Sequence, residues 1–523
     1  MCLLRLLVTF ASLLPALSAA TFTIAGVVVQ HASNTPLRRA RVSIASLGDR
    51  DRWISVVTGN QSEFSFTGLP AGKYSIAADV RGGRHLFQQN EGFSTAIAVG
   101  PNLDSEHIVF AMDAAAAING SVVDEDGDPV ANAQILLFRR GIVSGRLKTA
   151  LLYQASTSAA GEFHVRNLTP GTYFAAVQAR PWFAQYQPRP PNAPQNANEL
   201  DVVYPLTYYP GSTNLADATP LSLADGATSD LRLTLRAVPA LHIALEGTLP
   251  EELPQLFQLG PGGTEIAASS VVSFADAARR ELSGVPPGDY IVNFQRVREG
   301  VPEGAGRMAV TLTGDATINV GELRKMGITG TVILPQRQRT RSPGVRLENV
   351  ANGHIVQSMV AQDGSFHFNA GSTPPGRYEL RLEDSELYMQ AIAVKGATYS
   401  RGELDVHDGS SIQLSITAAQ GLSNVTGTAT KDGQTYGGAM ILLIPQDFSH
   451  GSYFPRDQSD SDGTFSLNSA PPGRYTLLAI EDGHELAYHD PAAIAPYLKQ
   501  GQSIEIPLPP GTETKIEVQR LKL

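Results

Sequence analysis

The residues best suited to ligand binding lie in one long segment, residues 180–211, which is rich in proline and asparagine. Long loops inside compact domains are often functional. Aromatic rings can stack on sugars or on peptide prolines, but they can also anchor a loop to its own domain. Anchoring is the favoured interpretation, and ligand contact is the alternative. The candidate ligand-binding residues are Trp182, Phe183, Tyr186, Tyr204, Tyr208 and Tyr209.

A second candidate is the acidic run at residues 124–128, whose alternating carboxylates are similar to a calcium-binding loop. Its glycine stands at the fourth position of the loop instead of the sixth, and Ile135 occupies the place of the bidentate glutamate. A hairpin turn is therefore the favoured interpretation. A weak calcium site at Asp124, Asp126 and Asp128 is the alternative.

Catalytic motifs are not found in the sequence. A catalytic zinc site needs two close ligands and an open position, yet none of the 11 histidines has a glutamate three positions later. His484 and His489 are spaced by five residues, which places them off the i, i+4 face of a helix. There is also no nucleophile elbow, phosphate loop or dinucleotide fingerprint. We therefore expect no enzyme activity, no catalytic residues and no cofactor; a hydrolase with an unrecognised site is the least favoured alternative.

A repeat in the chain indicates the elements that must position these residues. A Pro-Gly turn (Pro-Ala-Gly in the first copy), one further residue and a tyrosine recur together. The copies lie roughly 100 residues apart, which is the size of a domain. This periodicity indicates five tandem modules. The five corner tyrosines are Tyr74, Tyr173, Tyr290, Tyr378 and Tyr475.

Two further features recur in phase with the tyrosines. An opening strand of the form Ile/Val-x-Gly-x-Val/Ala starts at Ile24, Ile118, Ile328 and Val425. A tight turn and a strand with one or two phenylalanines precede the Pro-Gly turn, and Phe-x-Phe places both rings on one face. The third module lacks the opening glycine and has Arg280 where the first phenylalanine is expected. Each module shows about seven short alternating runs, which is typical of an antiparallel sandwich.

These residues resemble the carboxypeptidase regulatory-like domains, a prealbumin-like (transthyretin-like) family with starch-binding-like relatives. The resemblance is closest in the second module, at residues 118–124, 127–133, 161–163 and 170–173. It implies an all-β chain, a tandem array of about five prealbumin-like antiparallel β-sandwich domains. It also implies carbohydrate or protein binding, and no catalytic residues.

The landmarks give the expected domain boundaries. Residues 1–20 have the charged, apolar and small-residue regions of a signal peptide. The remaining expectations are β-sandwich 1 at 21–113, β-sandwich 2 with the long aromatic loop at 114–237, the degenerate β-sandwich 3 at 238–325, β-sandwich 4 at 326–420 and β-sandwich 5 at 421–523. The short joints between modules favour a semi-rigid rod. Residues 274–282 are the best candidate for a short helix.

Composition narrows the class of protein. Charged residues make up 17% and hydrophobic residues 42%, which fits a folded chain that is neither disordered nor membrane-spanning. No apolar run after the first 20 residues approaches the length of a membrane helix. The single cysteine, Cys2, lies in the expected signal peptide, so the mature chain would have no disulfide. The net charge of −10 argues against nucleic acid as a partner.

The sequence therefore predicts an exported, non-catalytic scaffold with a structural, adhesive or binding role at the bacterial envelope. Its expected location is secreted, periplasmic or cell-surface. An array of carbohydrate-binding modules is the alternative function. The expected partners are a glycan or an envelope protein, with no nucleic acid and no transmembrane segment after signal cleavage. The sequence leaves the oligomeric state open.

Overall fold

The structure, a computed structural model, describes residues 20–80, 83–187, 199–246, 255–274, 280–298, 301–319, 324–335, 342–368, 373–407, 410–448, 451, 454–507 and 515–522. Residues 1–19 of the expected signal peptide lie outside this part. The chain divides into two compact units. The smaller unit comprises residues 1–88 and 94–112, and the larger comprises residues 89–93 and 113–523.

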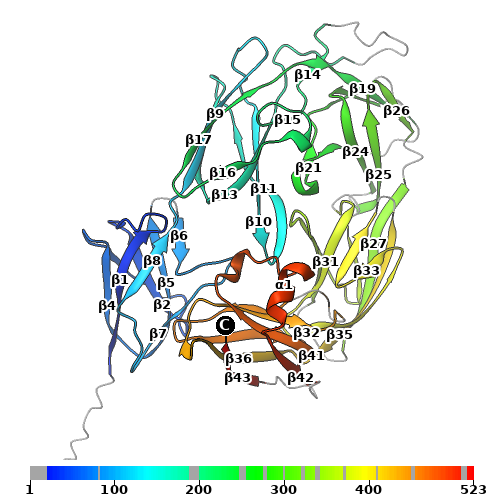
Figure 1. Cartoon of the computed structure of the whole chain (residues 1–523). Coiled ribbons are helices and arrows are strands. Elements are labelled where there is room, and N and C mark those ends of the chain that lie inside the picture. Colours follow the sequence, from blue (N-terminus) through cyan, green and yellow to red (C-terminus); the bar gives the residue numbers. More distant parts are fainter. Residues whose placement is uncertain are drawn as a thin grey trace, which may run out of the picture. The chain divides into compact units, whose positions relative to one another are not determined.

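The smaller unit is the first module, a sandwich of two sheets (Figure 1). Its opening strand pairs antiparallel with the Phe-x-Phe strand on one side and parallel with the last strand on the other. One sheet has the order β4 (Glu63–Leu69), β1 (Phe22–Gln30), β8 (Ile108–Met112). The other has the order β3 (Ile54–Val57), β2 (Arg41–Ser46), β5 (Gly72–Val80), β6 (Gly83–Leu86), with β7 (Ile97–Val99) also on β5.

The larger unit repeats this plan, beginning with the second and third modules. In the second, β9 (Ala116–Val123) lies between β12 (Glu162–Leu168) and β17 (Thr228–Thr234), and the other sheet contains β11 (Arg146–Ser156), β10 (Gln134–Val143), β13 (Gly171–Gln178), β15 (Thr207–Tyr208) and β16 (Leu221–Leu223). In the third, β19 (Leu241–Glu246) lies between β23 (Arg280–Val285) and β26 (Ala316–Asn319), with β22 (Val271–Phe274) on β23. Its other sheet contains β21 (Glu265–Ala267), β20 (Gln255–Leu259), β24 (Gly288–Arg298) and β25 (Val301–Leu312).

The last two modules follow the same order. In the fourth, β27 (Arg324–Ile333) lies between β30 (Ser365–Phe368) and β35 (Ser411–Gln420), with β32 (Leu387–Lys395) on β35. Its other sheet is β29 (Ile355–Met359), β28 (Gly344–Asn349), β31 (Gly376–Glu383), β34 (Glu403–Val406) and β33 (Thr398–Ser400). In the fifth, β36 (Ser423–Lys431) pairs with β37 (Gln434–Thr435), β40 (Thr464–Ala470) and β43 (Lys515–Lys522), opposite β39 (Arg456–Gln458), β38 (Met440–Pro445), β41 (Gly473–Ile480) and β42 (Gln502–Ile506).

The predicted fold class, an all-β tandem array of antiparallel β-sandwiches, is confirmed. Each module has its own hydrophobic core between its sheets; in the second it includes Ile118, Phe163 and Tyr173. One feature was not expected from the sequence: the opening and final strands of every module run parallel. The residue boundaries of the modules remain predictions.

The corner tyrosines have one role in all five modules. Each ring is buried, and each hydroxyl donates a hydrogen bond to the backbone carbonyl four residues earlier. The glycine two residues before each tyrosine has a φ of 149–156°, which side-chain-bearing residues rarely adopt. The bonds are Tyr74 to Pro70 (3.0 Å), Tyr173 to Thr169 (2.7 Å), Tyr290 to Pro286 (2.8 Å), Tyr378 to Pro374 (2.6 Å) and Tyr475 to Pro471 (2.7 Å).

The expected helix at residues 274–282 is wrong. Phe274 ends β22 and Arg280 begins β23, and the two strands pair with each other. The α-helix of the described chain is instead α1 (Pro491–Leu498), which was not expected. Asp490 caps it by accepting a hydrogen bond from the Ala492 backbone at 2.9 Å. In the part of the chain that is described, no helix has the length and apolar character needed to cross a membrane.

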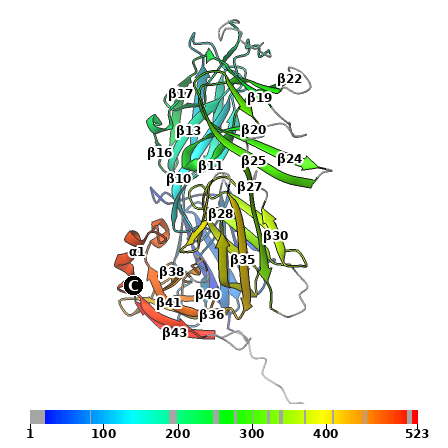
Figure 2. The ribbon, with the colours of Figure 1, turned by 90° about the vertical axis from the view of Figure 1, so that its right-hand side faces the viewer.

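Within the larger unit, modules that are distant in sequence contact each other. The hairpin β10–β11 points toward the segment before α1 (Figure 1), and the Gly145 carbonyl accepts a hydrogen bond from the His489 backbone at 3.1 Å. Thr149 donates its backbone N–H to Ala351 at 2.9 Å. The third and fourth modules also share a sheet, since β25 pairs with β27 (Figure 2).

We expect Tyr378→Phe to lower the free energy of unfolding of the fourth module by about 1 kcal/mol, because it removes one net hydrogen bond. Tyr497→Phe, at an exposed tyrosine of α1, is the matched control and should change nothing. Urea unfolding followed by circular dichroism measures both. Equal stabilities for the two variants would contradict the role of the corner hydroxyl.

Gly330→Ala should destabilise the fourth module by about 1–3 kcal/mol, because overpacking forces neighbours apart. An added Cβ would lie 2.3 Å from the Phe366 ring and 2.7 Å from the Leu414 carbonyl oxygen. Gly327 lies in the same strand, where a Cβ would meet no heavy atom within 4 Å. Gly327→Ala is therefore the control for glycine replacement as such, and calorimetry should separate the two melting temperatures.

Candidate functional site

The aromatic residues at the end of the long loop are part of the second module's packing. Tyr204 belongs to the core between the sheets, and Tyr209 packs against that core. Tyr208, in β15, is buried in a second cluster with Phe138 and Leu206. Burial raises the pKa of Tyr204 to about 12, reinforced by the negative charges of Glu125, Asp124 and Asp126. Buried rings of this kind hold the loop onto the sandwich.

Tyr186, at the start of the loop, joins the second module to the third. Its hydroxyl donates to the Val202 carbonyl at 3.0 Å, and its ring lies so close to Gly284 that a Cβ there would approach it to 2.9 Å. The Arg180 guanidinium lies 5.9 Å from the ring centroid and donates to the Ser270 carbonyl at 3.1 Å. Burial raises the pKa of Tyr186, while the charge of Arg180 opposes that shift.

Trp182 differs from the other loop aromatics because 92% of its surface is exposed. Phe183 supports it from one side, with ring centroids 5.7 Å apart in an edge-to-face arrangement. Gln185 donates its backbone N–H to the Leu200 carbonyl at 2.9 Å, which ties the two ends of the loop together. The structure therefore presents one large aromatic face to solvent beside the ordered base of this loop.

The acidic run at residues 124–128 forms a tight turn. The Asp124 carboxylate accepts the backbone N–H groups of Asp126 at 3.0 Å and Asp128 at 2.9 Å. Gly127 has a φ of 89° and closes the turn. Across the described residues, no three His, Cys, Asp or Glu side chains are grouped so that they could hold a metal ion. Calcium binding at Asp124, Asp126 and Asp128 stays a prediction.

A buried cluster of polar side chains lies where the second module meets the third. Nε2 of His242, in β19, is 2.7 Å from the Asp201 carboxylate. Nδ1 of the same ring contacts the Glu281 carboxylate, in β23. Ser283 donates to that carboxylate at 3.1 Å. All four side chains are buried.

These residue types occur in hydrolase triads, but the geometry differs from that of a triad. A nucleophilic serine must donate to the imidazole and face the substrate. Ser283 donates to Glu281 instead, and its surface is fully covered. The imidazole has a carboxylate at each of its ring nitrogens and so bridges Asp201 and Glu281. The arrangement is suited to holding β19, β23 and the base of the loop together.

Sequence reasoning missed this cluster, although a signal was present. His242 interrupts the otherwise apolar strand β19, and Glu281 lies in a strand that is buried almost throughout. Buried charged residues are rare unless they are paired. The histidine among the apolar residues of β19 is therefore a sequence signal for a buried pair, whereas β23, with the sequence RELSGV, gives none for Glu281. The third partner, Asp201, comes from a loop and has no such pattern.

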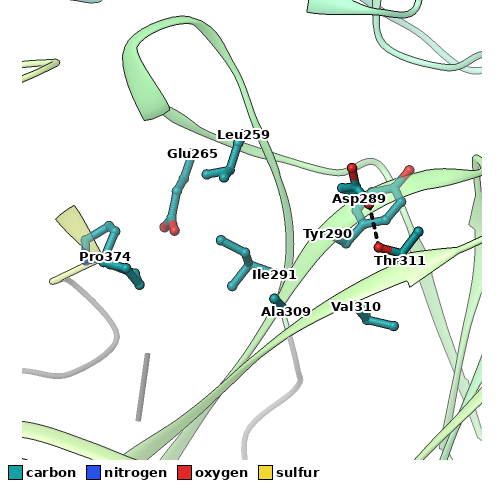
Figure 3. Close-up of a pocket in the computed structure, with 10 residues that line it drawn as sticks. Leu259, Glu265, Asp289, Tyr290, Ile291, Ala309, Val310, Thr311 and Pro374 are labelled. Carbon is teal, nitrogen blue, oxygen red and sulfur yellow. Dashed lines mark hydrogen bonds between the residues drawn. The ribbon is translucent and has the colours of Figure 1, made fainter. Parts of the chain in front are cut away.

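A cavity of about 380 Å³ lies between the third and fourth modules (Figure 3). Leu259, Ile291 and Ala309 form apolar walls on one side, and Pro374 closes the other. Glu265 points toward the cavity, while Asp289, at its edge, accepts a hydrogen bond from Thr311 at 2.6 Å. An apolar cavity with an acidic edge can hold an apolar group that carries positive charge.

Comparison with solved structures finds distant similarity to bacterial pilins. The chain is similar to a minor pilin of Streptococcus agalactiae, with 14% identity, 44% of this chain and 99% of the pilin covered, and a TM-score of 0.21. The shaft pilin SpaA of Lactobacillus rhamnosus GG is 8% identical, with 44% of this chain and 100% of the pilin covered and a TM-score of 0.20. The major pilin subunit BcpA of Bacillus cereus is 12% identical, with 77% of this chain and 99% of the pilin covered and a TM-score of 0.14.

No curated protein matches the chain. A family model does match: that of the carboxypeptidase regulatory-like domain, over residues 117–204. The matched segment begins in the opening strand β9 and includes the corner tyrosine Tyr173. This match confirms, for the second module, the family resemblance inferred from its turns and strands.

Proposed function

We propose that the chain is a non-catalytic, multidomain structural scaffold of the bacterial envelope, secreted, periplasmic or at the cell surface. The observation that carries this proposal is the role of the residues that recur among the modules. The five tyrosine hydroxyls bond to backbone carbonyls, and the recurring glycines and phenylalanines shape turns and fill cores. The residues that recur from module to module therefore maintain the fold of each sandwich.

The contacts between modules support the same function. The shared β25–β27 pairing and the Tyr186 contact with Gly284 join consecutive modules. The hairpin β10–β11 connects the second module to the fourth and fifth. A set of sandwiches fixed in this way presents its surface loops in a defined arrangement, which suits a scaffold.

The proposal is tested by fractionating cells that produce the full chain and by cross-linking the envelope fraction. The scaffold should be found in that fraction, cross-linked to envelope components. Purified protein should show no turnover on panels of peptides and glycosides. Two results together would overturn the proposal. Turnover would have to persist in the purified protein, and a single substitution at an exposed residue would have to abolish it without changing the melting temperature.

Carbohydrate binding is a second candidate function, favoured by the exposed Trp182 face. The chain has two tryptophans, so Trp53→Phe leaves Trp182 as the single tryptophan. We expect glycan titration to shift the emission of this variant if the loop stacks on sugar rings. Trp182→Ala should lose retention on the same glycan, whereas Tyr497→Ala, at an exposed ring elsewhere, should keep it. No emission change with any glycan of the panel would exclude this function at Trp182.

The scaffold proposal also predicts that the buried histidine cluster acts on stability. His242→Ala leaves two buried carboxylates without their shared donor, and we expect it to lower the free energy of unfolding by about 3–5 kcal/mol. His164→Ala, at an exposed histidine of β12, is the control and should cost less than about 0.5 kcal/mol. Calorimetry of the full chain measures both. A His242→Ala variant of unchanged stability would contradict the structural role.

A further inference from the structure

A row of three glutamates crosses one sheet of the fourth module. Glu348 in β28 lies directly opposite Glu379 in β31, and Glu379 lies directly opposite Glu403 in β34. Like charges placed opposite each other on neighbouring strands destabilise a sheet. Glu379 is only 5% exposed, so water does little to screen this row. The row is therefore stable only with positive charge close to it.

The second module supplies that charge from about 200 residues away, by its hairpin β10–β11. Arg146 places Nη1 2.6 Å from Glu403, and its Nε lies 3.9 Å from Glu379. Lys148 contacts Glu348 at 2.5 Å and is itself 6% exposed. Residues Arg146 and Lys148 alternate with Leu147, which is exposed, so one face of β11 is cationic and docked.

Arginines of the fourth module complete the charge balance. Arg346 pairs with Glu348 at 2.7 Å, Arg381 with Glu379 at 2.8 Å and Arg377 with Glu403 at 3.2 Å. For Glu348, burial acts to raise the pKa. The hydrogen bond and charge of Lys148, with the charges of Arg346 and Arg381, outweigh burial and hold that pKa below its ordinary value. The glutamate is therefore an anion that depends on the hairpin for part of its compensation.

The tip of the hairpin reaches the fifth module. Gly145, with a φ of 69°, lies under the Tyr488 ring, where a Cβ would come within 2.3 Å. Its carbonyl accepts the His489 backbone N–H, and the His489 ring stacks on Phe454 at 4.2 Å. Burial, followed by the charges of Arg146, Arg381, Lys148 and Arg401, lowers the pKa of His489 to about 2, so this ring is neutral.

The hairpin extends beyond the sheet of its own module. Its pairing with β13 ends at Arg140, whereas the β10–β11 ladder continues from there to Val143 and Arg146. The outer part is thus a two-stranded arm with its own hydrogen bonds. Val143 and Leu147 of the arm are exposed. The polar contacts of the hairpin with the fourth module include the ion pairs of Arg146 and Lys148 and the backbone hydrogen bond from Thr149 to Ala351.

We propose that this arm is an electrostatic latch. Docked on the glutamate row, it fixes the second module to the fourth and fifth; released, it leaves every sandwich folded and exposes the glutamate row. Release transfers the paired charges to water and its counterions, so rising ionic strength favours the released state. The latch goes beyond the scaffold function, since it makes the arrangement of the modules switchable.

Trypsin tests the latch, because Arg146 and Lys148 are cleavage sites that docking covers. The double variant Glu348→Gln, Glu403→Gln leaves the arm sequence intact and removes two of its anionic partners. We expect cleavage after Arg146 and Lys148, followed by mass spectrometry, to accelerate at least about tenfold. Glu505→Gln, at an exposed glutamate of β42, is the matched control and should leave the rate unchanged. In the parent chain, raising NaCl should accelerate the same cleavages.

A second measurement keeps the test valid if the double variant unfolds. Lys148→Gln leaves the fourth module untouched, and dyes on Leu152→Cys and Met359→Cys, in a Cys2→Ser background, report the separation of the second and fourth modules. The latch requires lower energy transfer in Lys148→Gln than in the parent, and a further loss with NaCl in the parent. Unchanged transfer and unchanged cleavage in folded variants, at every salt concentration, would overturn the proposal.

Discussion

A buried tyrosine hydroxyl needs a hydrogen-bond acceptor, and the architecture of all five modules depends on which group accepts this bond. The acceptor is the carbonyl four residues earlier, so the bond closes the turn that leads from one sheet into the other. The glycine between them takes a φ that other residues avoid. Burial raises the pKa of Tyr173 to about 12, which keeps its hydroxyl protonated as a donor. With its single cysteine at position 2, the rest of the chain relies on such packing instead of disulfides.

Short sequence patterns were sufficient to predict the fold because the turns and strand faces that define it are each encoded by neighbouring residues. A Pro-Gly-x-Tyr corner, a Phe-x-Phe strand and an opening glycine each encode a turn or a face within a few residues. The parallel pairing of β9 with β17 joins strands about 100 residues apart, and no short pattern specifies it. The helix α1 was missed because its eight residues include Pro491 and Pro496 and lack a clear apolar face. Residues 274–282 were mistaken for a helix because their sequence, FADAARREL, is rich in alanine and in arginine and glutamate, which favour helices.

The candidate site could be predicted only as a segment. Composition identified the loop at residues 180–211, but it could not distinguish buried rings from the exposed Trp182. That distinction depends on the tertiary fold: Tyr204 and Tyr208 face cores, whereas Tyr186 meets a glycine of the next module. In the cluster around His242, the histidine stands out among the apolar residues of β19, while Glu281, in the polar sequence of β23, and Asp201, in a loop, do not.

The glutamate row shows why contacts between modules escape sequence analysis while remaining physically necessary. In the sequence, Glu348, Glu379 and Glu403 are three ordinary surface residues of alternating strands. Only strand register places them side by side, and only then does the concentration of negative charge become evident. Arg146 and Lys148 look equally ordinary in a hairpin that extends past its own sheet. Arg346, Arg381 and Arg377 compensate part of the row within the fourth module, and Arg146 and Lys148 add the positive charge that ties the second module to it.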